Sequence, residues 1–277
     1  MKNRWAFAGV LMFCLTPIFA QNHEIAITID DLPFVGSANG KEGNLKREHD
    51  RFMNIMDALV DNQVPTTGFV IANSIEPGQW ELLEQFHQHG FIIGNHTYSH
   101  ANLNTMSAER YIDEIQHADQ ILAPLMTEQK YFRYPYLAEG RGEKKIKVQE
   151  YLANNGYIIA PVTIDSKDYR FNAELLHISW RVREQHVAAI KQRYLNYIWK
   201  QTLKAEKQAK SGEDKQILLI HANLINSYCL RDIIKMYQDH GYTFISLGQA
   251  LEHAAPAIKV PEAPVQPTEA LKPIDGA

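Results

Sequence analysis

The sequence is poor in cysteine, with only Cys14 and Cys229 among its 277 residues. Cys14 falls in an apolar N-terminal stretch that has the composition of an export signal. We therefore expect the mature chain to keep a single thiol, which cannot form an internal disulfide. The stability of the fold must come from a hydrophobic core and not from covalent cross-links.

The sequence also lacks a strong charge of either sign, because its net charge is −4. Proteins that bind nucleic acid neutralise phosphates with clustered basic residues, so we expect no nucleic-acid partner. Beyond the N-terminal stretch, no apolar run approaches the ~20 residues that a membrane-spanning helix needs. We expect a protein that does not span a membrane.

The two ends of the chain differ in composition from the rest. Residues 1–20 combine two basic residues with an apolar run and a final small residue, which is the pattern of a secretory signal peptide. This pattern predicts a secreted or periplasmic protein. Residues 256–277 contain many prolines and no hydrophobic periodicity, which indicates a flexible tail. Residues 21–255 remain, enough for a single domain with one large core.

Within this domain, short apolar segments alternate with amphipathic ones. The strand candidates are seven segments, at residues 24–29, 67–72, 91–94, 131–134, 157–164, 217–220 and 242–247. Apolar residues recur at helical spacing over residues 45–59 and 111–122, with a helix start expected at Ser107. The stretch from Asn172 to Lys210 is also helical in pattern, with six residues available for burial: Trp180, Ala188, Tyr194, Leu195, Ile198 and Trp199. Repeated strand and helix segments predict a parallel α/β fold, with an α/β barrel within reach of this length.

Residues capable of chemistry follow these strands directly or lie at their ends. They are Asp30, Asp31, His96, Arg133, Asp165 and His221. In parallel α/β folds the carboxyl ends of the strands form the edge at which ligands bind. We therefore expect these side chains to meet at one site.

Asp30, Asp31, His96 and His100 together suggest a metal centre. Two adjacent carboxylates repel each other unless a cation or a proton relieves the repulsion. One carboxylate and two neutral imidazoles make a three-ligand hydrolytic site for zinc or another divalent first-row ion, and the second aspartate can act as a base on the metal-bound water. Taken alone, the paired aspartates can equally begin a turn, and a His-x-x-x-His spacing is more often incidental.

Three further stretches contribute possible partners. Arg133 can hold a catalytic aspartate ionised, although a strand-end arginine is commonly an ordinary ion pair. His221 closes an apolar run, where its pKa can be tuned for proton transfer, although a core histidine often occupies such a position. The stretch TIDSKDY offers Asp165 and Asp168, either of which can orient His221.

Five stretches in this order, TIDD, HTYSH, RYPY, DSKDY and LIH, resemble the motifs of the polysaccharide deacetylase family, also called the NodB-homology domain or carbohydrate esterase family 4. The resemblance covers the chain from Ile25 to about Leu251. It implies that residues 21–255 form a single catalytic domain with a distorted (β/α)7 barrel. It also implies a divalent ion, zinc first and cobalt as an alternative, and removal of acetyl groups from sugars.

The resemblance also implies a role for each motif residue. Asp30 is then the base, supported by Arg133, and Asp31, His96 and His100 hold the metal. His221 protonates the leaving amine, and Asp168 tunes His221. Three residues surround the acetyl group: Tyr136 through its backbone N–H, with Tyr169 and Leu219 as the pocket wall.

The chain departs from the family pattern without losing a ligand or a proton carrier. The departures are Ile29 for Phe, Leu32 for Gly, Tyr134 for Pro, Tyr169 for Trp and Ala222 for Asp. The leading hypothesis is an N-deacetylase of glycans that contain N-acetylglucosamine, such as peptidoglycan or chitin-like oligosaccharides. An esterase for O-acetylated polysaccharides or a hydrolase of small amides is the first alternative, and an inactive glycan-binding protein is the second.

Overall fold

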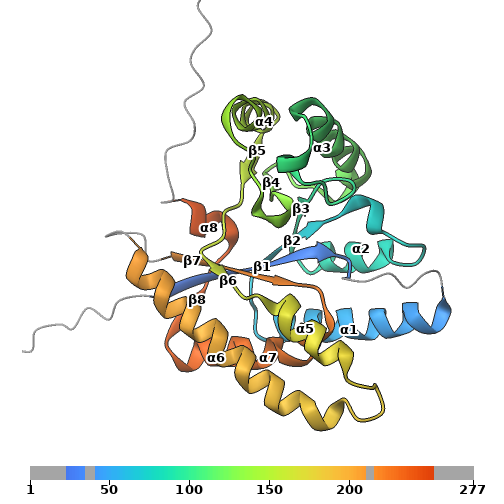
Figure 1. Cartoon of the computed structure of the whole chain (residues 1–277), viewed down its shortest axis with the longest axis vertical. Coiled ribbons are helices and arrows are strands. Elements are labelled where there is room, and N and C mark those ends of the chain that lie inside the picture. The colour runs from blue at the N-terminus through green and yellow to red at the C-terminus, as the bar shows by residue number, and fades with distance from the viewer. Residues whose placement is uncertain (1–22, 35–40, 210–214, 253–277) are drawn as a thin grey trace, which may run out of the picture.

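The computed structural model of the chain describes residues 23–34, 41–209 and 215–252 (Figure 1). The expected signal peptide and the expected tail lie outside these residues. The strands are β1 (His23–Leu32), β2 (Thr66–Val70), β3 (Ile92–Asn95), β4 (Lys130–Phe132), β5 (Tyr157–Ile159), β6 (Ile164–Asp165), β7 (Lys215–His221) and β8 (Tyr242–Phe244). The α-helices are α1 (Glu42–Asp61), α2 (Trp80–Gln88), α3 (Ala108–Leu122), α4 (Gly142–Asn154), α5 (Asp168–His177), α6 (Glu184–Gln208), α7 (Leu224–Asp239) and α8 (Leu247–Leu251).

All strand pairs in this part of the chain are parallel, in the order β5-β4-β3-β2-β1-β7-β6, with β8 also paired to β1. β5 and β6 are the two ends of this order, yet only residues 160–163 separate them in the chain. Such a connection spans at most about 19 Å. A flat sheet of seven strands would place its edges about 29 Å apart. The sheet must therefore curve toward closure, which confirms the α/β fold and the distorted barrel expected from the sequence.

The central strand β1 separates two environments through its alternating side chains. Ile25, Ile27 and Ile29 are fully buried and belong to the core that the outer helices share. Thr28 and Asp30 point to the other face, where both contact Arg133 from the loop after β4. Because side chains alternate along a strand, this pattern turns the polar residues of β1 into the curved interior of the sheet.

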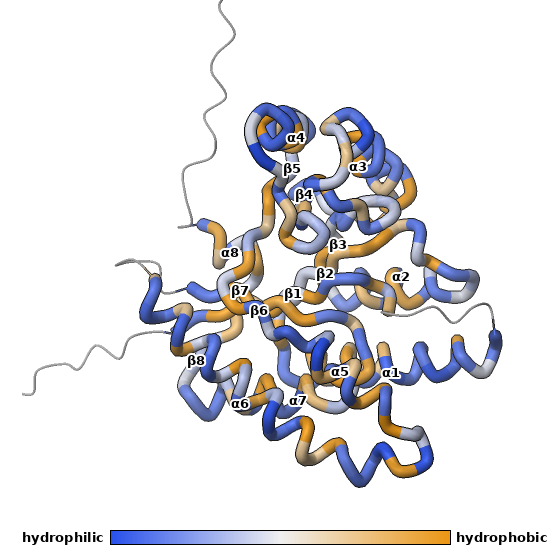
Figure 2. The backbone as a smooth tube through the Cα atoms, in the orientation of Figure 1, coloured by the Kyte–Doolittle hydropathy of each residue, from blue (hydrophilic) through white to orange (hydrophobic). Residues whose placement is uncertain are grey.

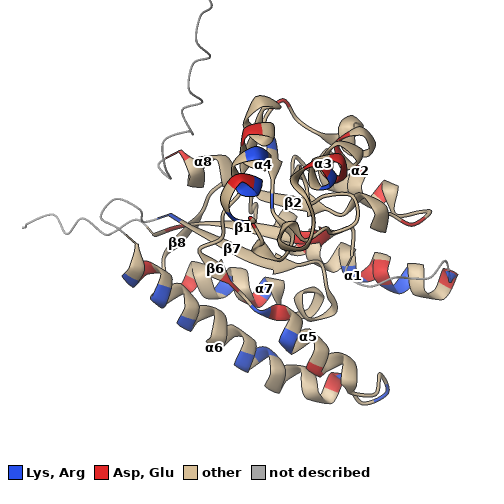
Figure 3. Cartoon of the chain, turned by 45° about the horizontal axis from the view of Figure 1, so that its top comes forward, with Lys and Arg blue, Asp and Glu red and all other residues tan. Residues whose placement is uncertain are grey.

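The helices cover the outside of the sheet with their apolar faces. Figure 2 shows hydrophobic residues concentrated on the central strands and on the inward sides of the helices. α1 packs beside α7, and α7 packs beside α6. Acidic and basic residues are interspersed over these helices (Figure 3). Among the described residues, no helix is both long and apolar enough to cross a membrane.

Most predicted elements are present, and two predictions need correction. The helices expected over residues 45–59 and 111–122 are α1 and α3, and Ser107 caps α3 by accepting from the Arg110 N–H. The single strand expected at residues 157–164 is two strands, β5 and β6, interrupted at Pro161, which has no N–H to continue a ladder.

The helix expected from Asn172 to Lys210 is interrupted as well. α5 ends at His177, and α6 begins at Glu184 after a connection in which Trp180 is 71% exposed. Of the residues expected to be buried there, Tyr194 and Ile198 are buried and Leu195 and Trp199 are half-buried, whereas Ala188 and Trp180 are exposed. The side chains of Trp180, between the two helices, and Ala188, in α6, are therefore not part of the core.

Candidate active site

The carboxyl ends of the strands surround a cavity of about 450 Å³. Its walls come from the carboxyl ends of β1, β6 and β7, from the segments that follow β3, β4, β6 and β7, and from α5. The lining residues are Asp30, Asp31, His96, His100, Tyr136, Leu137, Asp165, Lys167, Tyr169, Asn172, Leu219, His221 and Asn223. The chemistry-bearing residues expected at this edge therefore meet, and Arg133 lies directly behind them.

Three side chains, one from the end of β1 and two from the loop after β3, converge in this cavity. The Oδ1 atom of Asp31 lies 3.4 Å from Nε2 of His96 and 3.4 Å from Nε2 of His100. These three residues form a possible metal site, since their ligand atoms all lie within 4.8 Å of one another. Two ligands at bond lengths of about 2.1 Å from a tetrahedral ion are about 3.4 Å apart, which matches both distances.

The hydrogen bonding of this group also fits a cation. Nδ1 of His96 lies 2.8 Å from the carbonyl oxygen of Arg133, and a carbonyl only accepts, so Nδ1 carries the proton and Nε2 presents a lone pair. Oδ1 of Asp31 is buried and has no hydrogen-bond partner. A buried acceptor that faces the imidazole lone pair of His96 is unfavourable without a positive charge between them. The donor set therefore fits a divalent ion of the zinc type.

The protonation preferences agree with ligand roles. Burial by itself would raise the pKa of Asp31, but the facing imidazoles, His96 first, lower it to about 2. Burial lowers the pKa of His100 and outweighs the opposing effect of Asp31. Near neutral pH, Asp31 is thus ionised and His100 neutral, which are the forms that bind a metal.

Backbone conformation is unusual around the cavity. Seven non-glycine residues in the described part of the chain have positive φ, and five of them line the cavity: Asp31, His100, Tyr136, Leu137 and Lys167. Left-handed backbone costs about 1–2 kcal/mol for an ordinary residue. Strained conformations of this kind cluster at functional sites, where the surrounding structure holds them in place.

Asp30 lies beside the possible metal site and is held from below by Arg133. Both side chains are buried, and the guanidinium NH1 donates to Oδ1 of Asp30 at 2.8 Å and to Oγ1 of Thr28 at 2.7 Å. The remaining guanidinium donors reach the carbonyl oxygens of Ala160 and Pro161, at the break between β5 and β6. This bonding fixes Oδ1 of Asp30 and leaves Oδ2 facing the cavity side, 3.8 Å from Nε2 of His96.

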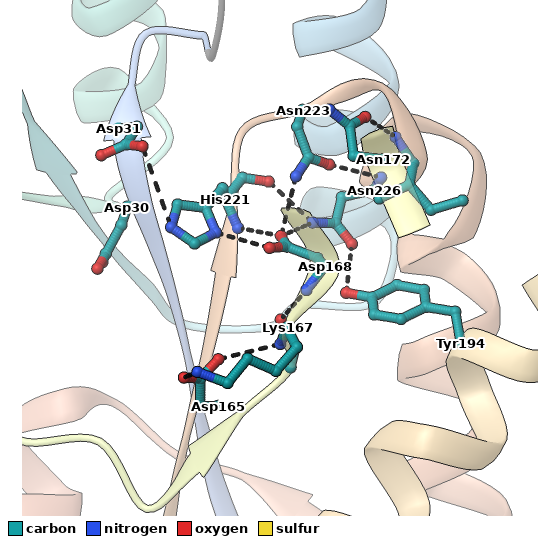
Figure 4. Close-up of polar contacts among 12 residues, drawn as sticks. Asp30, Asp31, Asp165, Lys167, Asp168, Asn172, Tyr194, His221, Asn223 and Asn226 are labelled. Carbon is teal, nitrogen blue, oxygen red and sulfur yellow. Dashed lines mark hydrogen bonds and ion pairs between the residues drawn. The ribbon is translucent and has the colours of Figure 1, made fainter. Parts of the chain in front are cut away.

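His221 forms the opposite side of the site with Asp168 behind it (Figure 4). Nδ1 of His221 lies 2.7 Å from Oδ1 of Asp168, and Nε2 lies 4.0 Å from Oδ2 of Asp31. Burial lowers the pKa of His221, but the charge and hydrogen bond of Asp168 outweigh this effect and raise it to about 10. His221 is thus protonated at neutral pH in the absence of an ion, with Nε2–H directed to the cavity.

Of the two carboxylates expected as partners of His221, the structure brings Asp168 to it. Asp165 instead accepts from the backbone N–H of Lys167 at 3.0 Å and pairs with its ammonium group at 2.6 Å. Tyr136, Tyr169 and Leu219 lie in the cavity wall, with Tyr136 and Tyr169 exposed and Leu219 buried.

Sequence reasoning missed several residues of the site. They are Leu137, Lys167, Asn172 and Asn223 in the wall, and Asn226 and Tyr194 behind it. Asn223 has a recognisable signal, because an asparagine just before an apolar helical segment is a common N-cap, and here its side chain accepts from the Asn226 N–H. Nothing local marks Tyr194, which contacts Asn226 across 32 positions in the chain.

Residues 20–157 match the family model described as polysaccharide deacetylase. The chain belongs to this family. The match includes Asp30, Asp31, His96, His100 and Arg133, whereas Asp168 and His221 lie beyond it, so their place in the site rests on the structure. The fold of this chain is similar to that of a solved chitin deacetylase from the fungal pathogen Colletotrichum lindemuthianum. The TM-score is 0.57, and the identity is 22% over 84% of this chain and 90% of that one.

The chain is also similar in sequence to proteins that are named as deacetylases of chitin and of peptidoglycan. A chitin deacetylase of Colletotrichum lindemuthianum is 31% identical over 177 residues, which cover 59% of this chain and 61% of that protein. A peptidoglycan-N-acetylglucosamine deacetylase of Bacillus cereus is 26% identical over 148 residues, or 53% of this chain and 46% of that protein. The matched segments thus span about half the length of these relatives.

Proposed function

We propose that this polysaccharide deacetylase family member is an exported, metal-dependent hydrolase that removes N-acetyl groups from glycans containing N-acetylglucosamine. The observation that carries the proposal is the convergence of an unpaired Asp31 oxygen, the imidazoles of His96 and His100, and the Asp30 and His221 side chains on one cavity. Metal-assisted hydrolysis of an amide uses this combination of a Lewis-acid site, a base and an acid.

Asp31, His96 and His100 would hold the ion, zinc being the best fit and cobalt an alternative. The ion supplies a Lewis acid that polarises the acetyl carbonyl and lowers the pKa of a water. Asp30 acts as the base, because Arg133 occupies its Oδ1 and Oδ2 remains to accept a proton from the attacking water. Arg133 keeps this carboxylate in one orientation through a charge-assisted hydrogen bond.

His221 supplies the second proton transfer. When the C–N bond of the amide breaks, the nitrogen departs as an amine and needs a proton, and Nε2–H of His221 provides it. Asp168 supports this role, since its contact with Nδ1 leaves Nε2 as the atom that faces the cavity. The products are acetate and a free amine on the sugar.

The cavity wall suits an acetyl group and part of a sugar. Leu219 and the ring of Tyr169 offer apolar surface, and the backbone N–H of Tyr136 is proposed as the donor to the developing oxyanion. The names of the relatives favour chitin-like oligosaccharides or peptidoglycan as the substrate. The composition of residues 1–20 supports a secreted or periplasmic location.

The experiment compares metal content and acetate release for the wild type, Asp30→Asn and His96→Ala, with chito-oligosaccharides, peptidoglycan fragments and O-acetylated xylan as substrates. We expect His96→Ala to lose the metal and Asp30→Asn to keep the metal but to lose at least about 100-fold in activity. A wild type that binds no metal, or an Asp30→Asn variant as active as the wild type, contradicts the proposal.

The same experiment separates the N-deacetylase from an esterase and from a glycan-binding protein. Acetate released from O-acetylated xylan but from no N-acetylated substrate indicates an esterase. Sugar binding without acetate release from any substrate, in the presence of zinc or cobalt, indicates a glycan-binding protein.

A further inference from the structure

Asp168 is fully buried beneath His221, and its two carboxylate oxygens have unequal surroundings (Figure 4). Oδ1 contacts the Nδ1 atom of His221, at 2.7 Å. Oδ2 accepts from the backbone N–H of His221 at 2.6 Å, from Nδ2 of Asn223 at 3.0 Å and from Nδ2 of Asn226 at 2.6 Å. Three donors on one oxygen fix the plane of the carboxylate and aim the other oxygen at the imidazole.

The side-chain amide of Asn226 connects Asp168, His221 and Tyr194 through hydrogen bonds. Its Nδ2 atom donates to Asp168 and also to the carbonyl oxygen of His221, at 2.9 Å, so both N–H bonds of the amide are used. Its Oδ1 atom accepts from the hydroxyl of Tyr194, at 2.9 Å. Rotating the amide by 180° would place its oxygen against two acceptors, so only one orientation is favourable.

One side chain thereby holds His221 at two points, through its main-chain carbonyl and through Asp168. Asn226 is fully buried and is absent from the cavity wall, so it does not touch a bound substrate. Tyr194, which fixes Asn226 from behind, is also fully buried and comes from α6, an element that contributes no residue to the cavity. Continuous hydrogen bonds therefore link the Tyr194 hydroxyl to Asn226, Asn226 to Asp168, and Asp168 to His221.

We propose that Asn226, held by Tyr194, is a positioning residue that aims Nε2 of His221 at the nitrogen of the departing amine. This inference rests on the proposed function, because it assigns to Asn226 a part in the proton transfer that His221 performs there. The transfer moves one proton from Nε2 of His221 to the amide nitrogen as the C–N bond breaks. Asn226 itself exchanges no proton.

A role in proton delivery predicts an effect that depends on the leaving group. An amine must be protonated to leave, whereas 4-nitrophenolate leaves without a proton. A change in the orientation of the His221 imidazole should therefore slow hydrolysis of N-acetylchitotetraose. It should leave hydrolysis of 4-nitrophenyl acetate in the same site unchanged. A general loss of structure would slow both reactions.

The test measures kcat and KM for both substrates with the zinc-loaded wild type, Asn226→Ala, Asn226→Asp, Tyr194→Phe and His221→Ala. Rates on the ester are corrected by the rate of Asp30→Asn, which reports hydrolysis outside the site. The matched control is Tyr237→Phe, because Tyr237 is also fully buried and loses a single hydrogen bond, to Thr202 at 2.7 Å, with no link to Asp168. Thermal unfolding of each variant accompanies the kinetics.

We expect Asn226→Ala and Asn226→Asp to lose at least about 10-fold in kcat on the amide, within the 100-fold or more attributable to a general acid. KM and the ester rate should change by less than threefold. Tyr194→Phe should show a smaller loss of the same kind, and Tyr237→Phe should show none. If the Asn226 variants do not fold, Tyr194→Phe against Tyr237→Phe decides the question.

Two results overturn the inference. One is an equal fall on amide and ester in the Asn226 and Tyr194 variants, and the other is no fall on either. His221→Ala distinguishes this failure from failure of the proposed function. If His221→Ala loses the same factor in rate on the amide as on the ester, relative to the wild type, the general-acid role of His221 is wrong. If His221→Ala affects only the amide while the Asn226 and Tyr194 variants do not, the positioning role alone is wrong.

Discussion

Asp30 and His221 are direct register partners on the adjacent parallel strands β1 and β7. The proposed base and the proposed acid therefore lie side by side at the same edge of the sheet. Each is fixed from below by a buried group of opposite charge, Arg133 for Asp30 and Asp168 for His221. The two buried partners reach the site from opposite sides of β1 and β7 in the sheet order, Arg133 after β4 and Asp168 after β6.

Replacement of Arg133 by methionine should be strongly destabilising. Asp30 would keep a buried charge without its partner, and a buried pair broken on one side costs about 3–5 kcal/mol. We expect a loss of this size in the free energy of unfolding, measured by urea denaturation with an unchanged slope. Asp30→Asn in the Arg133→Met background should recover part of the loss, because it removes the orphaned charge.

Lys130→Met provides the comparison for Arg133→Met. Lys130 pairs with Asp119 at 3.0 Å, but both side chains are about one-third exposed. A pair in such a position contributes at most about 1 kcal/mol. A similar small loss for both variants would contradict the importance assigned to the buried pair.

The pair of His221 and Asp168 should make stability depend on alkaline pH in the metal-free protein. The folded-state pKa of His221 is about 10 and its ordinary value is 6.5, so the pair contributes fully below pH 6.5 and its contribution is lost as the pH rises toward 10. Asp168→Asn should be less stable than the wild type at pH 6, and the difference should narrow by pH 10. Urea denaturation across this range measures it.

Asp239→Asn serves as the control for that experiment. Asp239 forms an exposed pair with Lys235 on α7, away from His221. Its effect on unfolding should be small and should not vary between pH 6 and pH 10. An Asp168→Asn variant whose destabilisation is also constant over this range would show that the pair does not raise the pKa of His221.

Much of the site follows from the sequence because its residues obey a local rule. Asp30, His96, Arg133 and His221 each follow or end an apolar strand, and parallel strands bring their carboxyl ends to one edge. The hydrophobic pattern also identified α1 and α3, whose apolar stripes pack on the sheet. These features need only the order of residues and the geometry of parallel strands.

Other features depend on contacts that the sequence does not display. Residues 178–183 contain no glycine or proline to mark the end of α5, so a continuous helix was the natural expectation. Pro161 did offer a signal for the break between β5 and β6, but the guanidinium contacts that stabilise the break come from Arg133, far away in the chain. The contact between Tyr194 and Asn226 is equally remote, and neither residue stands out from its neighbours.

The loop that carries His100 should depend on Glu114 of α3. The Glu114 carboxylate accepts from the N–H of Ser99 at 2.7 Å and from its hydroxyl at 2.9 Å, and the Glu114 carbonyl accepts from the N–H of Tyr98 at 3.1 Å. Glu114→Gln removes the charge of the carboxylate and so weakens both hydrogen bonds to Ser99, the neighbour of His100, whose φ is 60°. We expect zinc affinity to fall about 10-fold, as is common when partners of metal ligands are altered.

Zinc affinity is best measured by competition with a chelator at constant pH. Glu109→Gln is the matched control, because Glu109 is on the same helix but pairs with the exposed Lys147. Glu109→Gln should bind zinc as the wild type does. Equal affinities for all three proteins would mean that the loop holds His100 without Glu114.

Gly94 should tolerate no side chain, although it is in a strand with ordinary backbone geometry. A Cβ atom there would lie 2.6 Å and 2.7 Å from ring atoms of Phe69 and 3.1 Å from the carbonyl oxygen of Tyr131. Overpacking of this kind typically costs about 1–3 kcal/mol. The Phe69 ring also lies under the guanidinium of Arg133, at 4.3 Å, so its displacement should disturb Arg133 and reduce activity as well.

Gly43→Ala is the opposite case and completes the test. Gly43 lies in α1, where the nearest atom to a new Cβ is the end of the Arg47 side chain at 3.9 Å. Alanine is favoured over glycine in a helix interior by about 1 kcal/mol, and Gly43 is the second residue of α1, so this variant should be at least as stable as the wild type and fully active. Urea denaturation and acetate release measure both variants. If Gly94→Ala matched Gly43→Ala in stability and activity, the packing of Phe69 against β3 would not be what supports Arg133 from below.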